Sequence, residues 1–360
     1  MPFADQLGDL RRVVLSQGRV EPATPARFVT AAIDHRVIGA CVLALNEERL
    51  VLAEPEAREL RDAGAVAVLS TALAARELPA VAGAIAEATS APGIVLKGPA
   101  ISDRLYPDPG LRPYNDLDLM VARESLEDAK TALSAIGYEE RIQFRRGFEV
   151  AHGHTLDLVR EVGRKSVHVE VHWRLSDDRV GDAISHAALS QGAEPAPGVP
   201  GAAYPSLPDQ LLVCALHLMS HREKRLAWLE DIRRLHIAAT EADWNAGFER
   251  ADERGLLWVL NRALDYAERY LGLTAARPIG PGEPPAFGPV RAVEELDLQA
   301  SANIGRLAAL PWRQRPALVR DVLLPSRAAL DGLVGGDGAG RLRLVARHAR
   351  LVARGIAMRR

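Results

Sequence analysis

The sequence predicts an α+β fold in which a small mixed sheet lies between helical N-terminal and C-terminal layers. Three observations lead to this prediction. A single helical segment separates two short apolar runs in residues 93–121, and strand-like runs with Gly-containing turns follow. Ala-rich helical patterns precede this part of the chain, and long helical patterns follow it. One helix between two strands, followed by hairpins, fits a mixed sheet better than a doubly wound parallel sheet.

Residues 1–90 are predicted to form a helical N-terminal region. Residues 1–25 are polar and contain Pro, which favours a short helix and a linker. From Phe28 to Ala88, apolar residues recur at three- and four-residue spacing, as expected for helices. Pro79 is expected to break this region or to start a new helix. We expect a helical layer packed on one face of the sheet.

Residues 91–178 are predicted to contain the sheet. The patterns predict strands at 93–97, 116–121, 138–144, 147–151, 154–160 and 166–173, and helices at 99–106 and 125–136. Gly137 directly follows the second helix, a position where glycine commonly ends a helix.

The remaining chain is predicted to be a linker and a helical C-terminal region. Residues 179–208 are rich in Pro and Gly, which favours an extended connector. Residues 209–360 carry helical patterns separated by Pro- and Gly-rich breaks. Their end, Arg341–Arg360, is a basic amphipathic segment. It is typical of a terminal helix docked by its apolar stripe, and contact with acidic lipid or RNA is the alternative.

The composition favours a packed protein of the cytoplasm. The chain is 48% hydrophobic and 26% charged, and its net charge of −2 gives no overall attraction to nucleic acid. Cys41 and Cys214 lie far apart in apolar contexts and are interpreted as buried thiols in a reducing compartment. A signal-peptide pattern is not evident, and neither is a run of about 18 uncharged apolar residues, so no membrane span is expected.

The strongest chemical signal is the Asp116-Leu117-Asp118 triplet. Side chains alternate along a strand, so Leu117, Leu119 and Val121 are expected to face the core, and both aspartates the opposite side. Two carboxylates one strand-step apart repel each other unless a cation lies between them. Mg²⁺ binds carboxylate oxygens, and a pair of such ions can hold a triphosphate for in-line displacement.

Basic residues flank this triplet. Lys97-Gly98 follows the first strand, where a glycine lets backbone N–H groups approach phosphate oxygens and the lysine adds a positive charge. Arg112 lies in a Pro-rich loop just before the triplet. Its guanidinium could bind a phosphate in bidentate fashion, or pair with Asp116 or Asp118, and the sequence leaves both alternatives open.

A third carboxylate is predicted from the strand at 166–173. His168, Glu170 and His172 alternate with valines, so they share the polar face. Glu170 is the favoured metal ligand and a candidate general base, and Asp157 competes for this role. Zn²⁺ binding by the His-x-Glu-x-His pattern is disfavoured, because residues two apart on a strand are expected to diverge.

His217 and His221 lie four residues apart on a predicted helix, with Asp231 further along. This spacing can hold a metal ion, but the residues between the histidines lack a catalytic glutamate. Structural or substrate-lining histidines are the better interpretation, and the same reading covers His168 and His172 as substrate-lining residues.

The chain resembles the nucleotidyltransferase (polymerase-beta-like) superfamily, and more narrowly a family of uncharacterised bacterial nucleotidyltransferases. The resemblance extends from roughly Ala31 to Leu235. The matching residues are Leu96-Lys97-Gly98, Tyr106-Pro107, Arg112, Asp116-Leu117-Asp118-Leu119, His168–Trp173 and the helical block Asp209–Leu235. Superfamily members usually carry Gly-Ser at the Lys97-Gly98 position, a difference that the narrower family shares.

The resemblance implies a nucleotidyltransferase-type fold with Asp116, Asp118 and Glu170 as metal ligands. It implies two Mg²⁺ ions, with Mn²⁺ as an alternative, and phosphate binding by Lys97, Gly98 and Arg112. The implied reaction moves a nucleoside monophosphate from an NTP to an unknown acceptor hydroxyl or phosphate and releases pyrophosphate. ATP is the first candidate, and the acceptor is a small molecule or a macromolecule. The alternatives are a non-catalytic nucleotide- or partner-binding protein, and a metal hydrolase centred on His217, His221 and Asp231.

Overall fold

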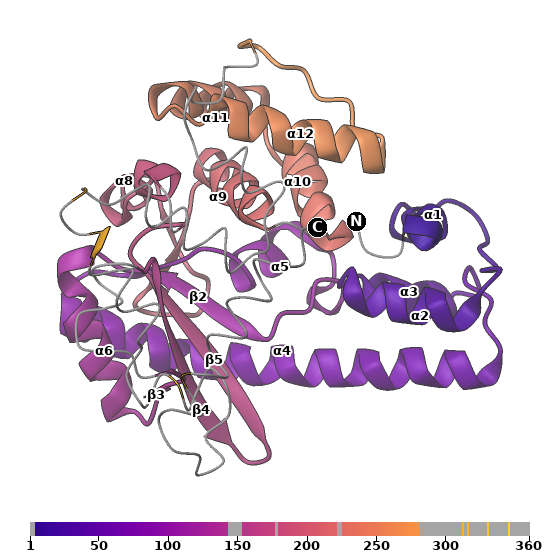
Figure 1. Cartoon of the computed structure of the whole chain (residues 1–360), viewed down its shortest axis with the longest axis horizontal. Coiled ribbons are helices and arrows are strands. Elements are labelled where there is room, and N and C mark those ends of the chain that lie inside the picture. The colour runs from indigo at the N-terminus through magenta and orange to yellow at the C-terminus, as the bar shows by residue number, and fades with distance from the viewer. Residues whose placement is uncertain are drawn as a thin grey trace.

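The computed structural model describes residues 4–142, 153–176, 179–221 and 225–280, with a few single residues beyond them. Over this part, the protein forms a seven-stranded mixed sheet with helices on both sides (Figure 1). The strands are β1 (Gly93–Val95), β2 (Asp116–Met120), β3 (Glu139–Glu140), β4 (Thr155–Val162), β5 (Lys165–His172), β6 (Glu194–Pro195) and β7 (Ala202–Tyr204). Their order is β3-β4-β5-β2-β1-β7-β6. The predicted α+β class is therefore confirmed.

The centre of the sheet combines both kinds of pairing. β2 runs parallel to β5 and antiparallel to β1, while β4 and β5 form an antiparallel hairpin. The predicted strands at 116–121, 154–160 and 166–173 are confirmed within a few residues. The run at 138–144 gives only the short β3, and the run at 147–151 lies outside the described residues. Gly137, with φ +90°, ends the helix as predicted.

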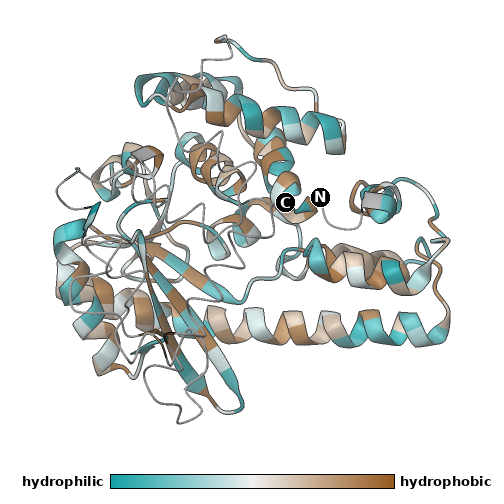
Figure 2. Cartoon of the chain, viewed as in Figure 1, coloured by the Kyte–Doolittle hydropathy of each residue, from teal (hydrophilic) through white to brown (hydrophobic). Residues whose placement is uncertain are grey.

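One face of the sheet is covered by α4 (Glu54–Thr89) and α6 (Leu126–Ala135). Buried residues of α4 pack with the apolar faces of β2 and β5 in one cluster, which includes Leu78, Val81, Ile85, Leu117, Leu119, Val169 and Val171. In Figure 2 the N-terminal end of α4, which extends past the sheet, is mostly hydrophilic. The expected helical layer on one face is therefore present, and α4 is its main element.

Pro79 does not break α4, so that prediction was wrong. Proline removes one N–H and crowds the preceding turn. Pro79 lies on the exposed side of the helix, where water can bind the carbonyl that loses its partner. Neighbouring Leu78 and Val81 are buried against the sheet and hold the helix together through this point.

α4 is also the one helix among the described residues with the length and hydropathy to cross a membrane. A third of its most apolar window, 33%, is buried in the protein. Core helices of globular proteins pass the same test of length and composition, so this feature is weak support for a span.

The second helical layer combines both ends of the described chain. α1 (Leu7–Val14), α2 (Pro25–Asp34) and α3 (Ile38–Asn46) share one core with α5 (Pro99–Leu105), α9 (Leu207–Ser220), α10 (Leu226–Ala238), α11 (Glu241–Glu253) and α12 (Leu257–Leu271). The remaining helices are the short α8 (His186–Ser190) and the 3₁₀ turns η1 (Ala4–Gln6), η2 (Pro109–Leu111), η3 (Arg123–Ser125) and η4 (Arg179–Ala183). The first helices thus share a core with the C-terminal helices, and α2 and α3 also pack against the N-terminal half of α4.

Residues 179–208 are more than the extended connector that their composition suggested. β7 pairs in parallel with β1 and so becomes part of the central sheet. Its residues Ala202–Tyr204 are buried, and the Tyr204 hydroxyl donates to Asp103 at 3.2 Å. Three residues between Pro- and Gly-rich turns are too short to show strand alternation, which is why the pattern missed them. The basic segment Arg341–Arg360 lies almost wholly outside the described residues.

Candidate active site

The aspartates of β2 lie where the alternation predicted. Leu117 and Leu119 are fully buried in the core, and the two aspartates share the opposite face. The Asp118 side chain is nevertheless 0% exposed, whereas that of Asp116 is 23% exposed. Asp118 is therefore enclosed, whereas Asp116 keeps contact with solvent.

The parallel pairing with β5 brings the third carboxylate beside this pair. Asp118 is in register with Glu170, and Asp116 with His168. Asp157 on β4 lies opposite Glu170 on the far side of β5, where its carboxylate is 3.0 Å from Arg141 and 3.9 Å from His168. Glu170 rather than Asp157 is thus the neighbour of Asp118.

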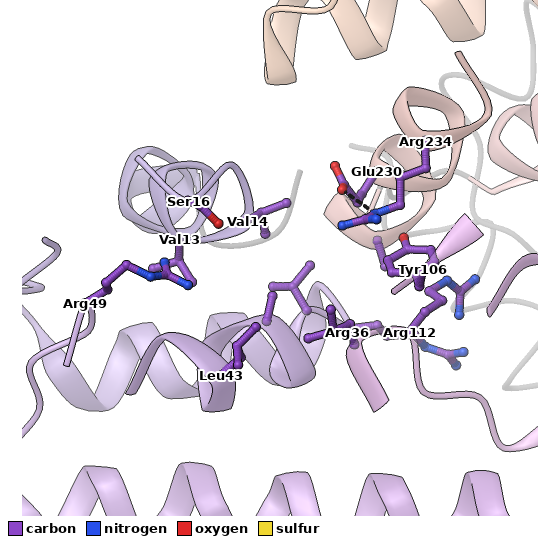
Figure 3. A pocket seen from close by; sticks show the side chains of 14 residues that line it. Val13, Val14, Ser16, Arg36, Leu43, Arg49, Tyr106, Arg112, Glu230 and Arg234 are labelled. Atoms are coloured by element: carbon purple, nitrogen blue, oxygen red, sulfur yellow. Dashed lines mark hydrogen bonds and ion pairs between the residues drawn. The ribbon is translucent and has the colours of Figure 1, made fainter. Parts of the chain in front are cut away.

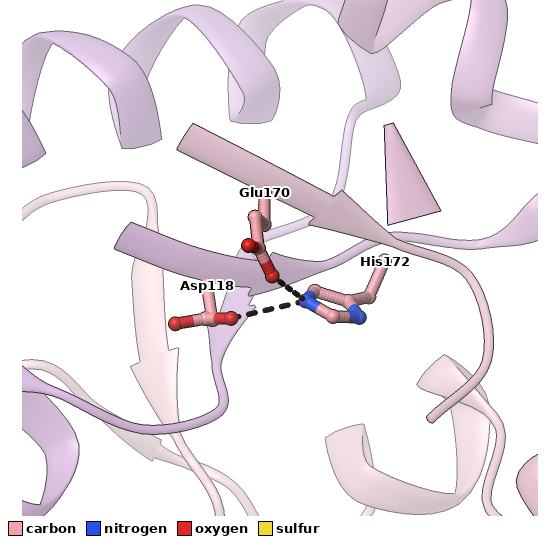
Figure 4. A group of neighbouring side chains, drawn as sticks. All are labelled: Asp118, Glu170 and His172. Carbon is pink, nitrogen blue, oxygen red and sulfur yellow. Dashed lines mark hydrogen bonds and ion pairs between the residues drawn. The ribbon is translucent and has the colours of Figure 1, made fainter. Parts of the chain in front are cut away.

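Asp118, Glu170 and His172 form a compact group of possible metal ligands (Figure 4). The His172 Nε2 lies 3.1 Å from Asp118 Oδ1 and 3.4 Å from Glu170 Oε2, and the three ligand atoms lie within 4.8 Å of one another. The expectation that residues two apart on this strand diverge was therefore wrong for Glu170 and His172. Both side chains lean toward Asp118, because the buried carboxylate attracts the imidazole.

The same contacts set the charges of the group. Burial alone would lower the pKa of His172, but hydrogen bonds and charges from Asp118 and Glu170 raise it to about 9. Burial would raise the pKa of Glu170, but His172 and Lys97 lower it to about 2. At neutral pH the group therefore consists of an imidazolium and a glutamate carboxylate around Asp118.

Lys97 is the second cation at Asp118. Its Nζ lies 2.9 Å from Asp118 Oδ1 and 3.8 Å from Asp116 Oδ2. Burial lowers the pKa of Lys97, but the charges of Asp118 and Asp116 outweigh this and raise it. Lys97 thus neutralises the carboxylates whose mutual repulsion called for a cation. To bind a phosphate oxygen, the Lys97 ammonium would have to divide its hydrogen bonds between phosphate and these carboxylates, or give up the carboxylates.

Gly98 directly precedes α5 with φ +62° and ψ −109°, a backbone conformation that residues with a side chain rarely adopt. An added Cβ would lie 3.3 Å from Tyr114 Cγ. The glycine therefore serves both the turn and the close approach of Tyr114, and it places the start of α5 beside Lys97.

The donor atoms fit a divalent cation. Asp118 Oδ2 is buried without a hydrogen-bond partner among the described residues, and a buried, unpaired carboxylate oxygen is costly unless a ligand satisfies it. Two carboxylates suit Mg²⁺ or Mn²⁺, and the imidazole nitrogen widens the choice toward transition metals. Asp118 and Glu170 would hold such an ion, with Asp116 beside them, and His172 would join them as a ligand only after its Nε2 has lost its proton.

Arg112 does not pair with Asp116 or Asp118. Its Nε donates to Asp231 Oδ1 at 2.8 Å and its Nη2 to Asp231 Oδ2 at 2.8 Å, in the interior of the protein. The Tyr106 hydroxyl donates to Asp231 Oδ1 at 2.8 Å. Both sequence-based alternatives gave Arg112 a different partner, because its true partner lies on α10, far along the chain. The guanidinium fork is committed to a carboxylate rather than held free for phosphate.

The histidines of α9 form a separate aromatic cluster. The rings of His217 and His221 are 4.6 Å apart, and both contact Trp228. Burial, then the charge of Lys97, lowers the pKa of His217 well below its usual value, so this ring is neutral at neutral pH. His217 and Lys97 line the same cavity of about 10 Å³. Because the Asp231 carboxylate is engaged by Arg112, these groups do not form a three-ligand metal site within the described residues.

Pattern analysis missed Arg36, in the turn between α2 and α3. Burial lowers the pKa of Arg36, and the charges of Asp116 and Asp118 oppose this effect, so the arginine lies within electrostatic range of the carboxylates. No local signal marks it, since it precedes the aspartates by about eighty positions and belongs to a helical region.

Strand-borne carboxylates, a lysine and a glycine before a helix are the features for which the sequence resembles the nucleotidyltransferases. The sequence profile of a family described as "uncharacterised nucleotidyltransferase" matches residues 21–272, and the chain belongs to this family. The match includes the N-terminal helices α2 and α3 as well as the sheet and α9–α12. Neither a curated protein nor a solved structure matches the chain.

Proposed function

We propose that the protein transfers a nucleoside monophosphate from an NTP, with ATP as the first candidate, to an acceptor hydroxyl or phosphate. The observation that supports this most directly is the register of β2 and β5. It places Asp118 against Glu170, beside Asp116, with a buried and unpaired Asp118 oxygen. Membership of a nucleotidyltransferase family supports the same reaction class.

In this proposal the acceptor oxygen forms a bond to the α-phosphorus, and the bond from that phosphorus to the bridging oxygen breaks. Pyrophosphate leaves with the electron pair of the broken bond, and the acceptor proton passes to solvent. A divalent ion bound at this site supplies charge neutralisation and an activated acceptor oxygen. Mg²⁺ is the first candidate, two ions are expected, and Mn²⁺ is the alternative.

The side chains then have distinct tasks. Asp116, Asp118 and Glu170 provide the negative charge that holds the cation, and His172 orients Asp118 and Glu170 through its Nε2. A pKa of about 2 makes Glu170 a poor proton acceptor, so we assign it the ligand role only. Gly98 lets the backbone at the start of α5 approach phosphate, and Lys97 is close enough to exchange its carboxylate contact for a phosphate oxygen.

A non-catalytic nucleotide-binding protein is the second candidate, and one observation favours it. Lys97 and His172 already neutralise Asp118, so a bound cation has to compete with two built-in ones. A protein in which these contacts persist would bind nucleotide weakly or without turnover.

The test compares wild type with Asp118→Asn and with Asp128→Asn, an exposed aspartate on α6 that serves as the matched control. Calorimetry with α,β-methylene-ATP and Mg²⁺ measures binding, and α-labelled NTPs with a panel of sugars, aminoglycosides, peptides and RNA measure transfer. We expect Asp118→Asn to reduce transfer roughly 100-fold or more and to remove the metal dependence of binding. Binding without label transfer would support the second candidate. Transfer that survives Asp118→Asn would refute the assignment.

A further inference from the structure

Arg36 is held in place by an unusual turn. It follows the end of α2 with φ +56°, a left-handed conformation that favours glycine. The neighbouring His35 is fully buried and accepts hydrogen bonds from α10: Leu226 N–H donates to its Nδ1 and Ala227 N–H to its backbone carbonyl, both at 3.2 Å. The turn between α2 and α3 is therefore fixed to the start of α10.

This turn places the Arg36 side chain at a cavity that Arg112 also lines. The side chain is half-buried and lines a cavity of about 60 Å³ between the N-terminal helices and α10. Figure 3 shows Arg36 and Arg112 together at the end of this cavity nearer to Tyr106. Burial lowers the pKa of Arg36, and Asp116 opposes that effect. Arg112 also lines the smaller cavity that Lys97 and His217 line, so Arg36 borders the group of side chains that surrounds the carboxylates.

Positive charge gathers at this point. Arg225 and Arg112 both lower the pKa of Arg36, as like charges do at short range. Arg225 also stacks on Trp228, with its guanidinium carbon 5.2 Å from the ring centroid. Arg36 and Arg225 thus add positive charge that is not paired with a carboxylate among the described residues, and such charge favours the binding of an anion.

The cationic side chains near the site differ in whether they are already paired with a carboxylate. Arg112 is engaged by Asp231 and Lys97 by Asp118. Across the cavity, Arg234 donates to Glu230 at 2.8 Å. Among the described residues, the Arg36 guanidinium forms neither a hydrogen bond nor an ion pair, although it is half-buried. Arg225 likewise forms neither among the described residues, but of these two arginines only Arg36 lines the cavity, so its donors are available to a ligand there.

We propose that Arg36 binds the phosphate chain of the nucleotide, so that the N-terminal helices contribute a residue to the active site. The inference rests on the proposed function. The guanidinium fork matches two phosphate oxygens, and a triphosphate carries the charge that Arg36 and Arg225 together attract. Arg36 thus takes the task that the sequence pattern had given to Arg112.

The experiment uses calorimetric titration of the full chain with α,β-methylene-ATP and Mg²⁺. Arg36→Gln removes the charge and Arg36→Lys keeps it without the fork. Arg58→Gln, at an exposed position of α4, removes the same charge far from the cavity. We expect about tenfold or greater weakening in Arg36→Gln, a smaller loss in Arg36→Lys, and no change in Arg58→Gln. AMP, with one phosphate, should show little of this difference.

A further variant separates folding from binding. Arg36→Gly removes the side chain but suits the left-handed turn, so it should be as stable as wild type or more stable in thermal unfolding. It should still bind the analogue about tenfold more weakly. Wild-type affinity in Arg36→Gln and Arg36→Gly would overturn the role of Arg36 and leave the proposed function standing. Absence of nucleotide binding by wild type itself would overturn both.

Discussion

The buried contact between Arg112 and Asp231 should be a major source of stability in the link between the sheet and α10. Both side chains are nearly inaccessible, at 5% and 3% exposure. The Asp231 carboxylate accepts bonds from Arg112 Nε and Nη2 and from the Tyr106 hydroxyl, each at 2.8 Å. Burial lowers the pKa of Arg112, but Asp231 raises it above its usual value, so the guanidinium stays charged at every pH of interest.

Asp231→Asn leaves that charge buried without its counter-charge. Loss of one partner of a buried ion pair lowers the free energy of unfolding by about 3–5 kcal/mol. Asparagine keeps one oxygen that can accept a hydrogen bond, so the loss should be near the lower limit, about 3 kcal/mol. The free energy of unfolding of a typical protein is only about 5–15 kcal/mol. We therefore expect a large fall in the denaturation midpoint, measured by guanidinium unfolding with circular dichroism and tryptophan fluorescence.

Two further variants test whether the loss of stability comes from an unpaired buried charge. Asp265→Asn removes the same charge from an exposed pair, 2.8 Å from Arg277, and should cost less than about 1 kcal/mol. The double variant Arg112→Met/Asp231→Leu should lose less than the sum of its single changes, because no charge is left unpaired.

A loss of unfolding free energy for Asp231→Asn as small as that for Asp265→Asn would refute the stabilising role of the Arg112–Asp231 pair.

Elemental analysis of wild type tests the alternative of a hydrolase centred on His217, His221 and Asp231. Stoichiometric zinc that disappears in Asp231→Asn would show that Asp231 is a metal ligand instead.

Two shorter predictions concern the pH dependence and the helix start. In metal-free protein, the rise in the pKa of His172 from 6.5 to about 9 corresponds to roughly 3 kcal/mol of stability. Because this pKa is raised, the stabilisation is fully present below pH 6.5 and is lost as the pH rises through 9. The unfolding free energy of wild type in EDTA should therefore fall between pH 6.5 and 9, and that of His172→Gln should not show this fall. The same fall in His172→Gln would contradict the assignment of the raised pKa to His172. Gly98→Ala should cost about 1–2 kcal/mol, because its φ is +62° and the new Cβ would meet Tyr114 at 3.3 Å. Gly83→Ala in α4, with open space around it, should be neutral or stabilising in the same thermal unfolding assay.

The parts of the structure that sequence could predict are those set by local periodicity. Alternation along β2 and β5 placed the valines and leucines in the core and the charged residues opposite them, which follows from strand geometry alone. The polar face of β5 could be predicted in the same way, but its register against β2, which brings Glu170 beside Asp118, could not.

Other contacts depend on pairing at long range, which periodicity does not encode. The partner of Arg112 lies on α10, so a loop arginine near two aspartates gave a plausible but wrong local solution. β7 joins the sheet through three residues, too few for a recognisable pattern. Arg36 reaches the site only because His35 fixes its turn to α10, a contact between segments nearly two hundred residues apart.

The charge balance of the site links the two proposals. Three carboxylates, Asp116, Asp118 and Glu170, face three cations, Lys97, His172 and Arg36, so the metal-free site is close to neutral. A triphosphate that enters with two Mg²⁺ ions is also close to neutral, so its binding needs no large change in the net charge of the site. What changes is the pairing: the ions take over the carboxylates, and the cations that they displace become available to phosphate oxygens. Arg36 holds no carboxylate within the described residues and can bind phosphate without this exchange. Its removal should therefore weaken nucleotide binding even under conditions in which Lys97 remains paired with Asp118.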